Sequence, residues 1–212
     1  MQYLAELSRN CSQKEKVLFD VGANKGQYIN QLHPYFQNSQ IYCFEPSPMA
    51  FSILSDSTNN MNNVKCYQLG IGHKETTLDL QFNTEGSVMA SFSPLEIDDS
   101  SRMRATSQLT TIDSFCQTNG IDEIYLLKLD IEGFELNALK GAESMIKKNK
   151  VNYIQFEFGK NNIQQGIYLK NFFDILRHYK LSRVLKDGLK ELSKHELRYE
   201  IILTTNYLAE LR

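Results

Sequence analysis

The amino-acid sequence predicts an α/β domain built on a mainly parallel sheet with helices on both faces. Short apolar runs that suit buried strands alternate along the chain with segments of helical periodicity, and this alternation is typical of parallel strands joined by helices. The length of 212 residues suits one domain, and 42% of the residues are hydrophobic, which is enough for a sizeable core. We expect residues 1–16 to form an N-terminal helical lead and residues 17–212 to form a single domain.

The first half of the chain begins this alternation. The expected elements are a strand at Val17–Val21, a helix from about Gln27 to Phe36, a strand at Ile41–Phe44, a helix after Pro46 and a strand at about Val64–Leu69. Leu78, Leu80 and Phe82 alternate with polar residues, which indicates a half-exposed strand. The polar, serine-rich segment 83–108 is long for a simple connection. It is interpreted either as a loop that covers a binding site or as a plain surface loop.

The second half continues the pattern. Residues Tyr125–Leu129 predict a buried strand, a helix begins near Phe134, and Tyr153–Phe156 predict a further strand. Leucine and phenylalanine at helical spacing predict an amphipathic helix over 169–176. The apolar residues of 201–203 and 207–208 indicate closing strands, whereas the charged segment 185–200 supports no prediction.

Charge, cysteine content and hydropathy exclude several classes of protein. The net charge is −2, and the tightest basic run, at residues 147–150, closes a predicted helix, where cations suit the helix dipole. We therefore expect no nucleic-acid partner. The four cysteines are not spaced as a metal or redox pair, which suits a reducing compartment, and a cytoplasmic protein is expected. The segment after Met1 is mixed and polar, so neither a signal peptide nor a membrane span is predicted.

The sharpest local feature is the segment DVGANKG, which begins at Asp20 and ends at Gly26. It leaves an apolar strand and enters a helix, and its glycines allow the backbone to turn tightly and to approach a ligand closely. Ligands of open α/β sheets bind beyond the carboxyl ends of the strands. Gly22, Asn24 and Gly26 are therefore predicted to border a cofactor, although a tight turn without a ligand would use the same glycines.

A second acidic residue supports the cofactor interpretation. Glu45 ends the next strand, immediately before Pro46, where an acid can accept hydrogen bonds from ribose hydroxyls. The dinucleotide fingerprint fails because Asn24 and Gln27 stand where its second and third glycines belong, and the chain has no phosphate-binding loop motif. A sulfonium cofactor carries no phosphate, and an acid such as Asp20 suits its cationic amino-acid part. An NAD-dependent oxidoreductase is therefore the less favoured alternative.

Further carboxylates follow two later strands. Asp130 and Glu132 come directly after one buried strand, and Glu157 ends the next. Because these strand ends should meet at one edge, the three acids can hold charged groups of the cofactor, bind a hard cation or act as a general base. Their mutual repulsion should raise at least one pKa, which suits a base near neutral pH. Glu135 is interpreted as an acid that complements a helix N-terminus.

These segments, in this order, resemble the FkbM family of S-adenosylmethionine-dependent methyltransferases. The resemblance spans about Val17 to Leu208, nearly the whole chain. The matching segments are DVGANKG at 20–26, FEPS at 44–47, LGIG at 69–72, LTTID at 109–113, KLDIEGFE at 128–135, LKGA at 139–142 and the acid Glu157.

The resemblance implies a Rossmann-like class I methyltransferase fold, with a seven-stranded, mostly parallel sheet and a final antiparallel strand. It implies S-adenosylmethionine (SAM) as the methyl donor. The glycine loop and Asp20 should then surround the amino-acid part of SAM, Glu45 should hold the ribose, and Gly70 and Ile71 should lie against the adenine. The full set of expected cofactor-binding residues is Asp20, Gly22, Asn24, Gly26, Glu45, Pro46, Gly70, Ile71 and Asp130.

The combined prediction is a SAM-dependent methyltransferase that O-methylates a hydroxyl of a small molecule or sugar. Asp130, Glu132 and Glu157 are the expected catalytic acids, and the residues leave open which of them is the base. A divalent cation is compatible with these oxygen ligands, but no metal site is predicted. One alternative is an inactive methyltransferase-fold binding module. A nucleic-acid methyltransferase is disfavoured by the acidic net charge and by the lack of an NPPY or DPPY block.

Overall fold

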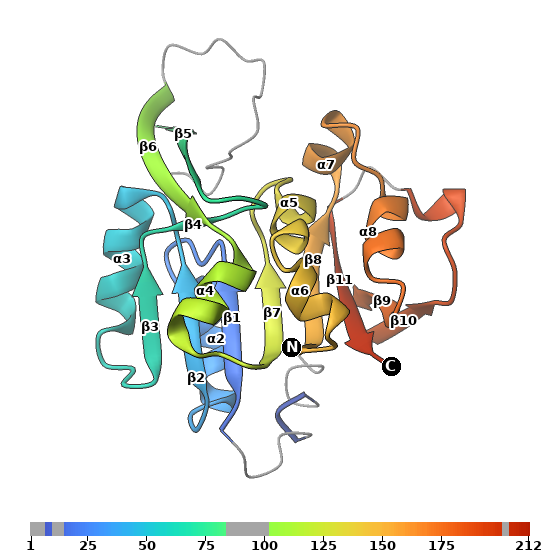
Figure 1. Ribbon diagram of the computed structural model, residues 1–212, viewed down its shortest axis with the longest axis horizontal. Helices are drawn as coiled ribbons and strands as arrows, with labels where there is room; N and C mark the ends of the chain where they lie inside the picture. Colours follow the sequence, from blue (N-terminus) through green and yellow to red (C-terminus); the bar gives the residue numbers. More distant parts are fainter. Residues whose placement is uncertain (1–6, 10–14, 84–101, 201–203) are drawn as a thin grey trace.

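The computed structural model describes residues 7–9, 15–83, 102–200 and 204–212, and it confirms the α/β class (Figure 1). In these residues the main sheet has eight strands in the order β10-β9-β11-β8-β7-β1-β2-β3. The strands β3, β2, β1, β7 and β8 run parallel to their neighbours in that row. Their bounds are β1 Val17–Val21, β2 Gln40–Phe44, β3 Val64–Tyr67, β7 Ile124–Leu129 and β8 Val151–Phe158.

Antiparallel strands complete the other side of the main sheet. β11 (Thr205–Leu211) lies between β8 and β9 (Tyr179–Leu185), and β10 (Gly188–Leu192) pairs with β9 at the edge. The expected count of seven strands is therefore one too few. The extra strand is β10, in which only Leu192 is buried, so this edge strand lacks the apolar alternation that would have predicted it.

Helices cover both faces of the main sheet, as predicted. Their bounds are α2 Gln27–Leu32, α3 Pro48–Thr58, α4 Ile112–Asn119, α5 Glu135–Lys140, α6 Glu143–Lys147, α7 Lys160–Gln164 and α8 Leu169–Ile175. Apolar residues of α2 and α3 form one core with Leu18, whereas those of α4, α5, α6 and α8 form a larger core with Phe19. The two neighbouring residues of β1 enter opposite cores because successive side chains of a strand alternate. No helix in the described ranges is long and apolar enough to cross a membrane.

A second, smaller sheet follows β3. β4 (Gly70–Ile71) pairs in parallel with β6 (Arg102–Thr110), and β6 pairs antiparallel with β5 (Thr76–Asn83). The strand expected around Leu78 is confirmed as β5. The loop expected over 83–108 is wrong for residues 102–108, which belong to β6, and residues 84–101 lie outside the described residues. The sequence of β6 is largely polar, so pairing with β5 rather than an apolar pattern identifies it as a strand.

Two predicted helices end earlier than expected, for local reasons. The helix expected to reach Phe36 ends at Leu32 and continues as a short 3-10 helix, His33–Tyr35, because Pro34 has no N–H for the next helical bond. The helix that begins after Phe134 is divided into α5 and α6 at Gly141. A Cβ at Gly141 would lie 2.0 Å from the carbonyl oxygen of Gly72, so the packed chain requires glycine there.

The predicted N-terminal lead is described only in part. Residues 7–9 are helical, and Leu7 is buried. The Tyr125 hydroxyl donates to the Leu7 carbonyl at 2.7 Å, which ties this turn to β7. The division of the chain at residue 17 stays a prediction.

The strand order places a ligand-binding edge at the centre of the sheet. β1 pairs with β2 on one side and with β7 on the other, so the order of connection reverses between β1 and β7. Open α/β sheets bind ligands at such a reversal, beyond the carboxyl ends of the strands. The segments that follow β1, β2, β7 and β8 therefore form the candidate site.

Candidate active site

The segment after β1 is a tight turn pressed against the loop that follows β7. Gly22, Asn24 and Gly26 all have positive φ angles, of 80°, 51° and 91°. A Cβ at Gly22 would lie 1.9 Å from the carbonyl oxygen of Asp130, so only glycine permits this approach. The N–H groups of Gly22 and Ala23 both donate to the Phe44 carbonyl at 3.0 Å, which fixes the turn against the end of β2.

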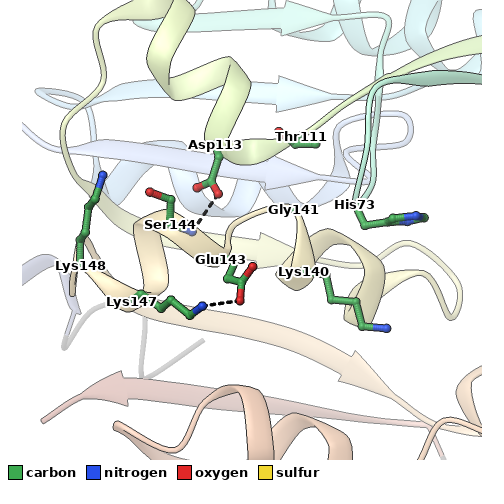
Figure 2. Close-up of a pocket in the computed structure, with 9 residues that line it drawn as sticks. All are labelled: His73, Thr111, Asp113, Lys140, Gly141, Glu143, Ser144, Lys147 and Lys148. Atoms are coloured by element: carbon green, nitrogen blue, oxygen red, sulfur yellow. Dashed lines mark hydrogen bonds and ion pairs between the residues drawn. The ribbon is translucent and has the colours of Figure 1, made fainter.

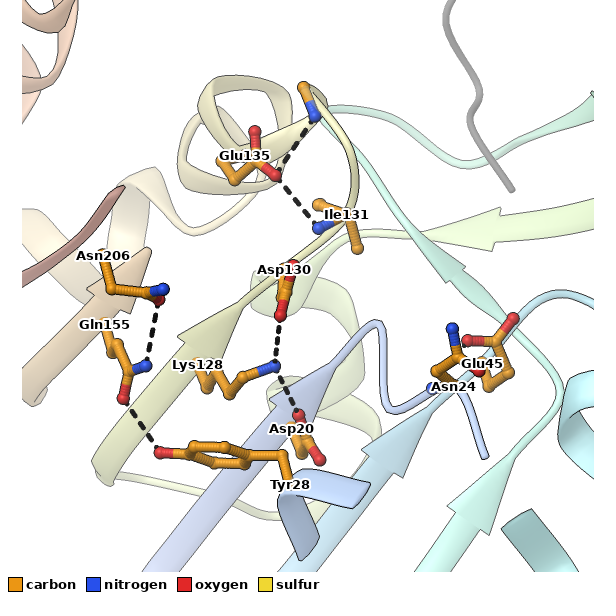
Figure 3. A network of polar contacts seen from close by, with 11 residues as sticks. Asp20, Asn24, Tyr28, Glu45, Lys128, Asp130, Ile131, Glu135, Gln155 and Asn206 are labelled. Carbon is orange, nitrogen blue, oxygen red and sulfur yellow. Dashed lines mark hydrogen bonds and ion pairs between the residues drawn. The ribbon is translucent and has the colours of Figure 1, made fainter. Parts of the chain in front are cut away.

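Glu45 joins the ends of β1 and β2. Its side chain accepts from the Asn24 N–H at 2.9 Å through Oε2 and from the Ser47 N–H at 2.8 Å through Oε1. Burial raises the pKa of Glu45, and the two N–H donors oppose this rise. Pro46 is buried next to it, and the Ser47 hydroxyl accepts from the Ala50 N–H at the start of α3. The acid is thus fixed within a rigid corner (Figure 3).

A buried lysine lies between two of the predicted acids (Figure 3). Lys128 Nζ is 3.3 Å from Asp20 Oδ1 and 3.2 Å from Asp130 Oδ2, and it lies 4.6 Å from the centre of the Tyr28 ring. Burial alone would lower the pKa of Lys128, but the two carboxylates outweigh burial and raise it, so the lysine is charged. Burial raises the pKa of Asp20, and Lys128 opposes that rise.

Amide side chains extend this network across the sheet. The Tyr28 hydroxyl donates to Gln155 Oε1 at 2.9 Å, and Gln155 Nε2 donates to Asn206 Oδ1 at 3.1 Å. These contacts join α2 to β8 and β11. Tyr28, Lys128, Gln155 and Asn206 were not among the predicted site residues. Lys128 is a lysine inside an otherwise apolar strand. Because a buried charge needs partners, this position could have indicated a polar network around it.

The loop between β7 and α5 is held from inside. The fully buried Glu135 accepts from the N–H groups of Ile131 and Gly133 at 3.0 and 3.2 Å through Oε1. Asn162 Nδ2 of α7 donates to its other oxygen at 2.7 Å. Glu135 stands in the first turn of α5, as expected, and its side chain also holds the loop before that helix. It fixes the backbone on both sides of Glu132, which has a φ of 54°.

Two acids of this region hold their protons unusually tightly. Burial, followed by the charges of Asp130 and Glu135, raises the pKa of Glu132 to about 7, while the Asn161 amide lowers it. Burial, followed by the charges of the other three acids, raises the pKa of Glu157 to about 8. Repulsion within this acidic group was predicted, and both groups therefore change charge near neutral pH.

A cavity of about 280 Å³ opens onto Glu132 and onto the ion pair of Lys128 and Asp130. Its lining residues come from the glycine turn, α2, β7 and the following loop; they are Gly22, Ala23, Asn24, Gln27, Tyr28, Gln31, Lys128, Asp130 and Glu132. Four predicted site residues are thus brought together at one cavity. Asp20 does not line the cavity but pairs with the lining residue Lys128. Glu45 does not line it either, but accepts a hydrogen bond from the backbone N–H of the lining residue Asn24. Gly26, Pro46, Gly70, Ile71 and Glu157 are not among its lining residues. Ile71 is only 1% exposed and belongs to the hydrophobic core.

A second cavity, of about 390 Å³, lies beside the helices α4, α5 and α6 (Figure 2). It is lined by His73, Thr111, Asp113, Lys140, Gly141, Glu143, Ser144, Lys147 and Lys148, and contains none of the predicted site residues. Its acids are already engaged: Asp113 accepts from the N–H groups of Ser144 and Met145, and Glu143 pairs with Lys147. This cavity is therefore not the candidate active site.

The first cavity has donors and acceptors that fit a cofactor with a charged amino-acid part. Asp20 Oδ2 and Asn24 Oδ1 are buried, and within the part of the chain that is described they have no hydrogen-bond partner. Buried polar atoms normally have partners, so these two atoms, one in the glycine turn and one near the end of β1, are places where a ligand can supply the missing hydrogen bonds. Among the described residues, no group of three or more histidine, cysteine or acidic side chains is arranged to hold a metal ion.

Comparison with known proteins identifies the family. A family model described as the methyltransferase FkbM domain matches residues 20–183. The chain is 20% identical over 189 residues to the 2-O-methyltransferase NoeI of Sinorhizobium fredii, which covers 83% of this chain and 77% of that protein. It is 25% identical over 171 residues to the hexuronic acid methyltransferase AglP of Haloferax volcanii, covering 81% of this chain and 65% of that protein.

The fold agrees with these relationships. A structure of SMU.1697c from Streptococcus mutans, described as a methyltransferase in complex with SAH, matches with a TM-score of 0.54 and 9% identity, over 100% of this chain and 97% of the other. The identity is low, so this likeness supports the fold alone. The family match covers most of the chain and includes the glycine turn, the β7 loop and Glu157. The chain therefore belongs to the FkbM family of methyltransferases and has the class I methyltransferase fold.

Proposed function

We propose that this protein is a SAM-dependent O-methyltransferase whose acceptor is a hydroxyl of a small molecule or sugar. The observation that carries the proposal is the composition of the cavity beyond β1 and β7. One part of it presents Asn24 of the glycine turn, with Asp20 behind it on Lys128. Among the described residues, Asp20 Oδ2 and Asn24 Oδ1 are buried and have no hydrogen-bond partner. The neighbouring part presents carboxylates that can accept a proton, including Glu132.

The residues around the glycine turn would hold the cofactor. Asp20, Asn24 and Asp130 would hold its amino-acid part, Gly22 and Gly26 would shape the turn beside it, and Glu45 with Pro46 would hold the ribose. Gly70 and Ile71 would lie towards the adenine. When bound, SAM supplies a methyl carbon attached to a positively charged sulfur. The charges agree with this: Asp20, Asp130 and Lys128 together leave one surplus negative charge beside the turn.

The carboxylates beyond β7 and β8 would handle the acceptor's proton. In the reaction, the hydroxyl oxygen bonds to the methyl carbon, the carbon–sulfur bond breaks with its electron pair left on sulfur, and the hydroxyl proton passes to a carboxylate. Removal of that proton by a placed base contributes about 10²–10⁴-fold to the rate. Asp130, Glu132 and Glu157 are the proposed residues for this step, and alignment of the reactants supplies much of the remainder.

The acceptor class rests on the cavity lining and on the relatives. Gln27, Gln31 and Tyr28 of α2 line the cavity, and amide and phenol groups donate and accept the hydrogen bonds that sugar hydroxyls require. The relatives NoeI and AglP carry the names of a 2-O-methyltransferase and a hexuronic acid methyltransferase. A carbohydrate hydroxyl is therefore the first acceptor to test.

Calorimetry tests the cofactor. Purified protein should bind SAM with one-to-one stoichiometry and should not bind NAD. Asp20→Asn keeps the size of the side chain but removes its charge, and we expect it to weaken SAM binding. Asp187→Asn makes the same change at an exposed residue between β9 and β10 and is the matched control. Folded protein that does not bind SAM would contradict the proposal.

A methyl-transfer assay tests the acceptor. Protein, SAM with a tritiated methyl group and methyl glycosides of neutral hexoses, deoxyhexoses and hexuronic acids are incubated together, and labelled ether product is counted. Glycosides whose hydroxyls are already methylated serve as the control acceptors. Label in the free glycosides alone supports O-methylation of a sugar. SAM binding without transfer to any of them would reject the sugar acceptor and retain the cofactor assignment.

A further inference from the structure

The three acids proposed for proton removal have different surroundings. Asp130 shares the buried cation Lys128 with Asp20, at 3.2 Å from its own carboxylate, so its carboxylate is held in an ion pair. Glu157 stands half-buried at the end of β8 and is not among the residues that line the cavity. Glu132 lines the cavity, and the amide of Asn161 holds one of its oxygens. These differences allow a choice that the sequence left open.

Glu132 is also the acid whose position is most strongly determined. Its φ of 54° is uncommon for a residue other than glycine, and such backbone is found chiefly where function requires it. Glu135 fixes the N–H groups on both sides of it. Asn161 Nδ2 donates to Glu132 Oε2 at 2.6 Å. A Cβ at Gly133 would lie 3.1 Å from Asn161 Cβ, so α7 packs directly against this loop.

We propose that Glu132 is the base that takes the acceptor's hydroxyl proton, and that Asn161 is the positioning residue that aims its carboxylate into the cavity. This inference rests on the proposed O-methyltransferase function. It assigns Glu157 a different part, as a neutral carboxylic acid that donates a hydrogen bond beside the base. In the proton step, the acceptor O–H bond breaks and the proton bonds to a Glu132 carboxylate oxygen. An electron pair of the acceptor oxygen forms the bond to the methyl carbon as the carbon–sulfur bond breaks.

The charges that face Glu132 support this division. Asp130 and Glu135 of its own loop and Glu157 of β8 repel a negative charge on Glu132, and Lys128 of β7 is the cation of the group. The same surroundings raise the pKa of Glu157 to about 8 and that of Glu132 to about 7. The Asn161 amide donates to Glu132 and stabilises its ionised form. The hydrogen bond from Asn161 therefore favours Glu132 as the acid that is ionised and accepts a proton.

Carboxyl titration tests this arrangement without an acceptor. Protein labelled with ¹³C at the glutamate carboxyl carbons is titrated by NMR, and the two signals are assigned by their loss in Glu132→Gln and Glu157→Gln. We expect the Glu132 signal to titrate at lower pH than the Glu157 signal. Asn161→Leu, which is close in size but has no donor, should move the Glu132 midpoint upward by about one pH unit. The opposite titration order, or a Glu132 midpoint that Asn161→Leu does not move, would overturn the proposal.

The rate–pH profile tests the catalytic part, with the glycoside that gives the highest turnover. We expect Glu132→Gln to lower kcat by about 10²–10⁴-fold and to remove the rise of kcat with pH. Asn161→Leu should shift that rise to higher pH, and Glu157→Gln should retain it with a smaller loss of rate. Glu191→Gln, at an exposed residue of β10, is the matched control and should behave as wild type.

Failure of this inference can be distinguished from failure of the proposed function. Labelled product from wild-type protein, combined with full kcat in Glu132→Gln, would reject Glu132 as the base while retaining the methyltransferase. Absence of SAM binding in wild-type protein would reject the proposed function itself. If SAM binds but no glycoside is methylated, the titration order and its response to Asn161→Leu still decide the arrangement of the acids.

Discussion

Replacement of Lys128 by methionine removes the cation that touches both Asp20 and Asp130 (Figure 3). Methionine fills a similar volume without charge, so the change isolates the ion pairs from packing. The side chain of Lys128 is 5% exposed and that of Asp20 is fully buried. Solvent therefore cannot compensate the Asp20 carboxylate once the ammonium is absent.

The magnitude follows from these distances. The buried contact between Lys128 and Asp20, at 3.3 Å, corresponds to a charge-pair attraction of about 5 kcal/mol at an effective dielectric constant near 20. The contact with Asp130, at 3.2 Å, contributes less because the Asp130 side chain is 38% exposed and solvent screens it. Desolvation of the buried lysine offsets part of this attraction, and removal of one partner from a buried pair typically costs about 3–5 kcal/mol. We therefore expect the free energy of unfolding to fall by about 3–5 kcal/mol at pH 7.5, and the melting temperature to fall by about 6–20 °C.

The loss should depend on pH with a defined sign. Burial already raises the pKa of Asp20, and loss of Lys128 raises it further above its value in the unfolded chain. A group with a raised folded pKa binds more protons when folded, so its contribution to stability is present at low pH and is lost as pH rises through the folded pKa. The deficit of Lys128→Met should therefore be smaller at pH 5 than at pH 7.5.

Urea unfolding of wild-type protein, Lys128→Met, Asp20→Asn and the double variant at both pH values measures these quantities. In Asp20→Asn/Lys128→Met neither buried charge of that pair remains, so the double variant should be more stable at pH 7.5 than Lys128→Met alone. A loss below about 1 kcal/mol, in the range of an exposed ion pair, would refute the reasoning. So would a deficit that is equal at pH 5 and pH 7.5.

Three other substitutions test separate parts of the site. Gly22→Ala should abolish SAM binding in calorimetry and should destabilise the fold by more than Gly120→Ala does. Both glycines have a positive φ, but a Cβ would collide with backbone atoms at Gly22 and would meet nothing within 4 Å at Gly120. Equal losses of stability in the two variants would contradict the steric argument. Glu45→Gln places an amide N–H against an N–H donor of Asn24 or Ser47. We expect a SAM affinity about 10–100-fold weaker by calorimetry, and a change below threefold would count against Glu45 as a ribose ligand. Glu135→Gln disturbs a fully buried acceptor of three donors and should lower the free energy of unfolding by about 1–3 kcal/mol in urea; unchanged stability would show that the loop does not depend on it.

The strands that carry the site could be predicted because their signals are local. β1, β2, β7 and β8 are apolar runs, and acids or glycines stand immediately after each of them. Strand order then places the ends of β1, β7 and β8 side by side. The strands β6 and β10 were missed because β6 is largely polar and β10 is largely exposed, and pairing with a neighbour stabilises both. β9 was missed although its Tyr179 and Leu181 are buried in the core.

The contacts that select among the acids could not be predicted. Asn161 reaches Glu132 across 29 positions of sequence, and Tyr28 reaches Gln155 across 127. Neither asparagine nor glutamine has a local pattern that identifies such a partner. The same limit applies to Gly141, whose role depends on the approach of Gly72.

The division of the site into two electrostatic halves follows from the register of the sheet. Lys128 is the register partner of Asp20 on β1 and of Gln155 on β8, so a neutral amide, and not an acid, stands beside it on the β8 side. The cation therefore compensates acids next to the glycine turn, where a ligand with one surplus positive charge would fit one surplus negative charge. Glu132, in the loop after β7, and Glu157, near the end of β8, have repelling neighbours, which is the condition for acids that exchange protons near pH 7. A lysine at Gln155 would reverse this: it would lower the pKa of Glu157 and remove the neutral acid that the proposed proton transfer requires.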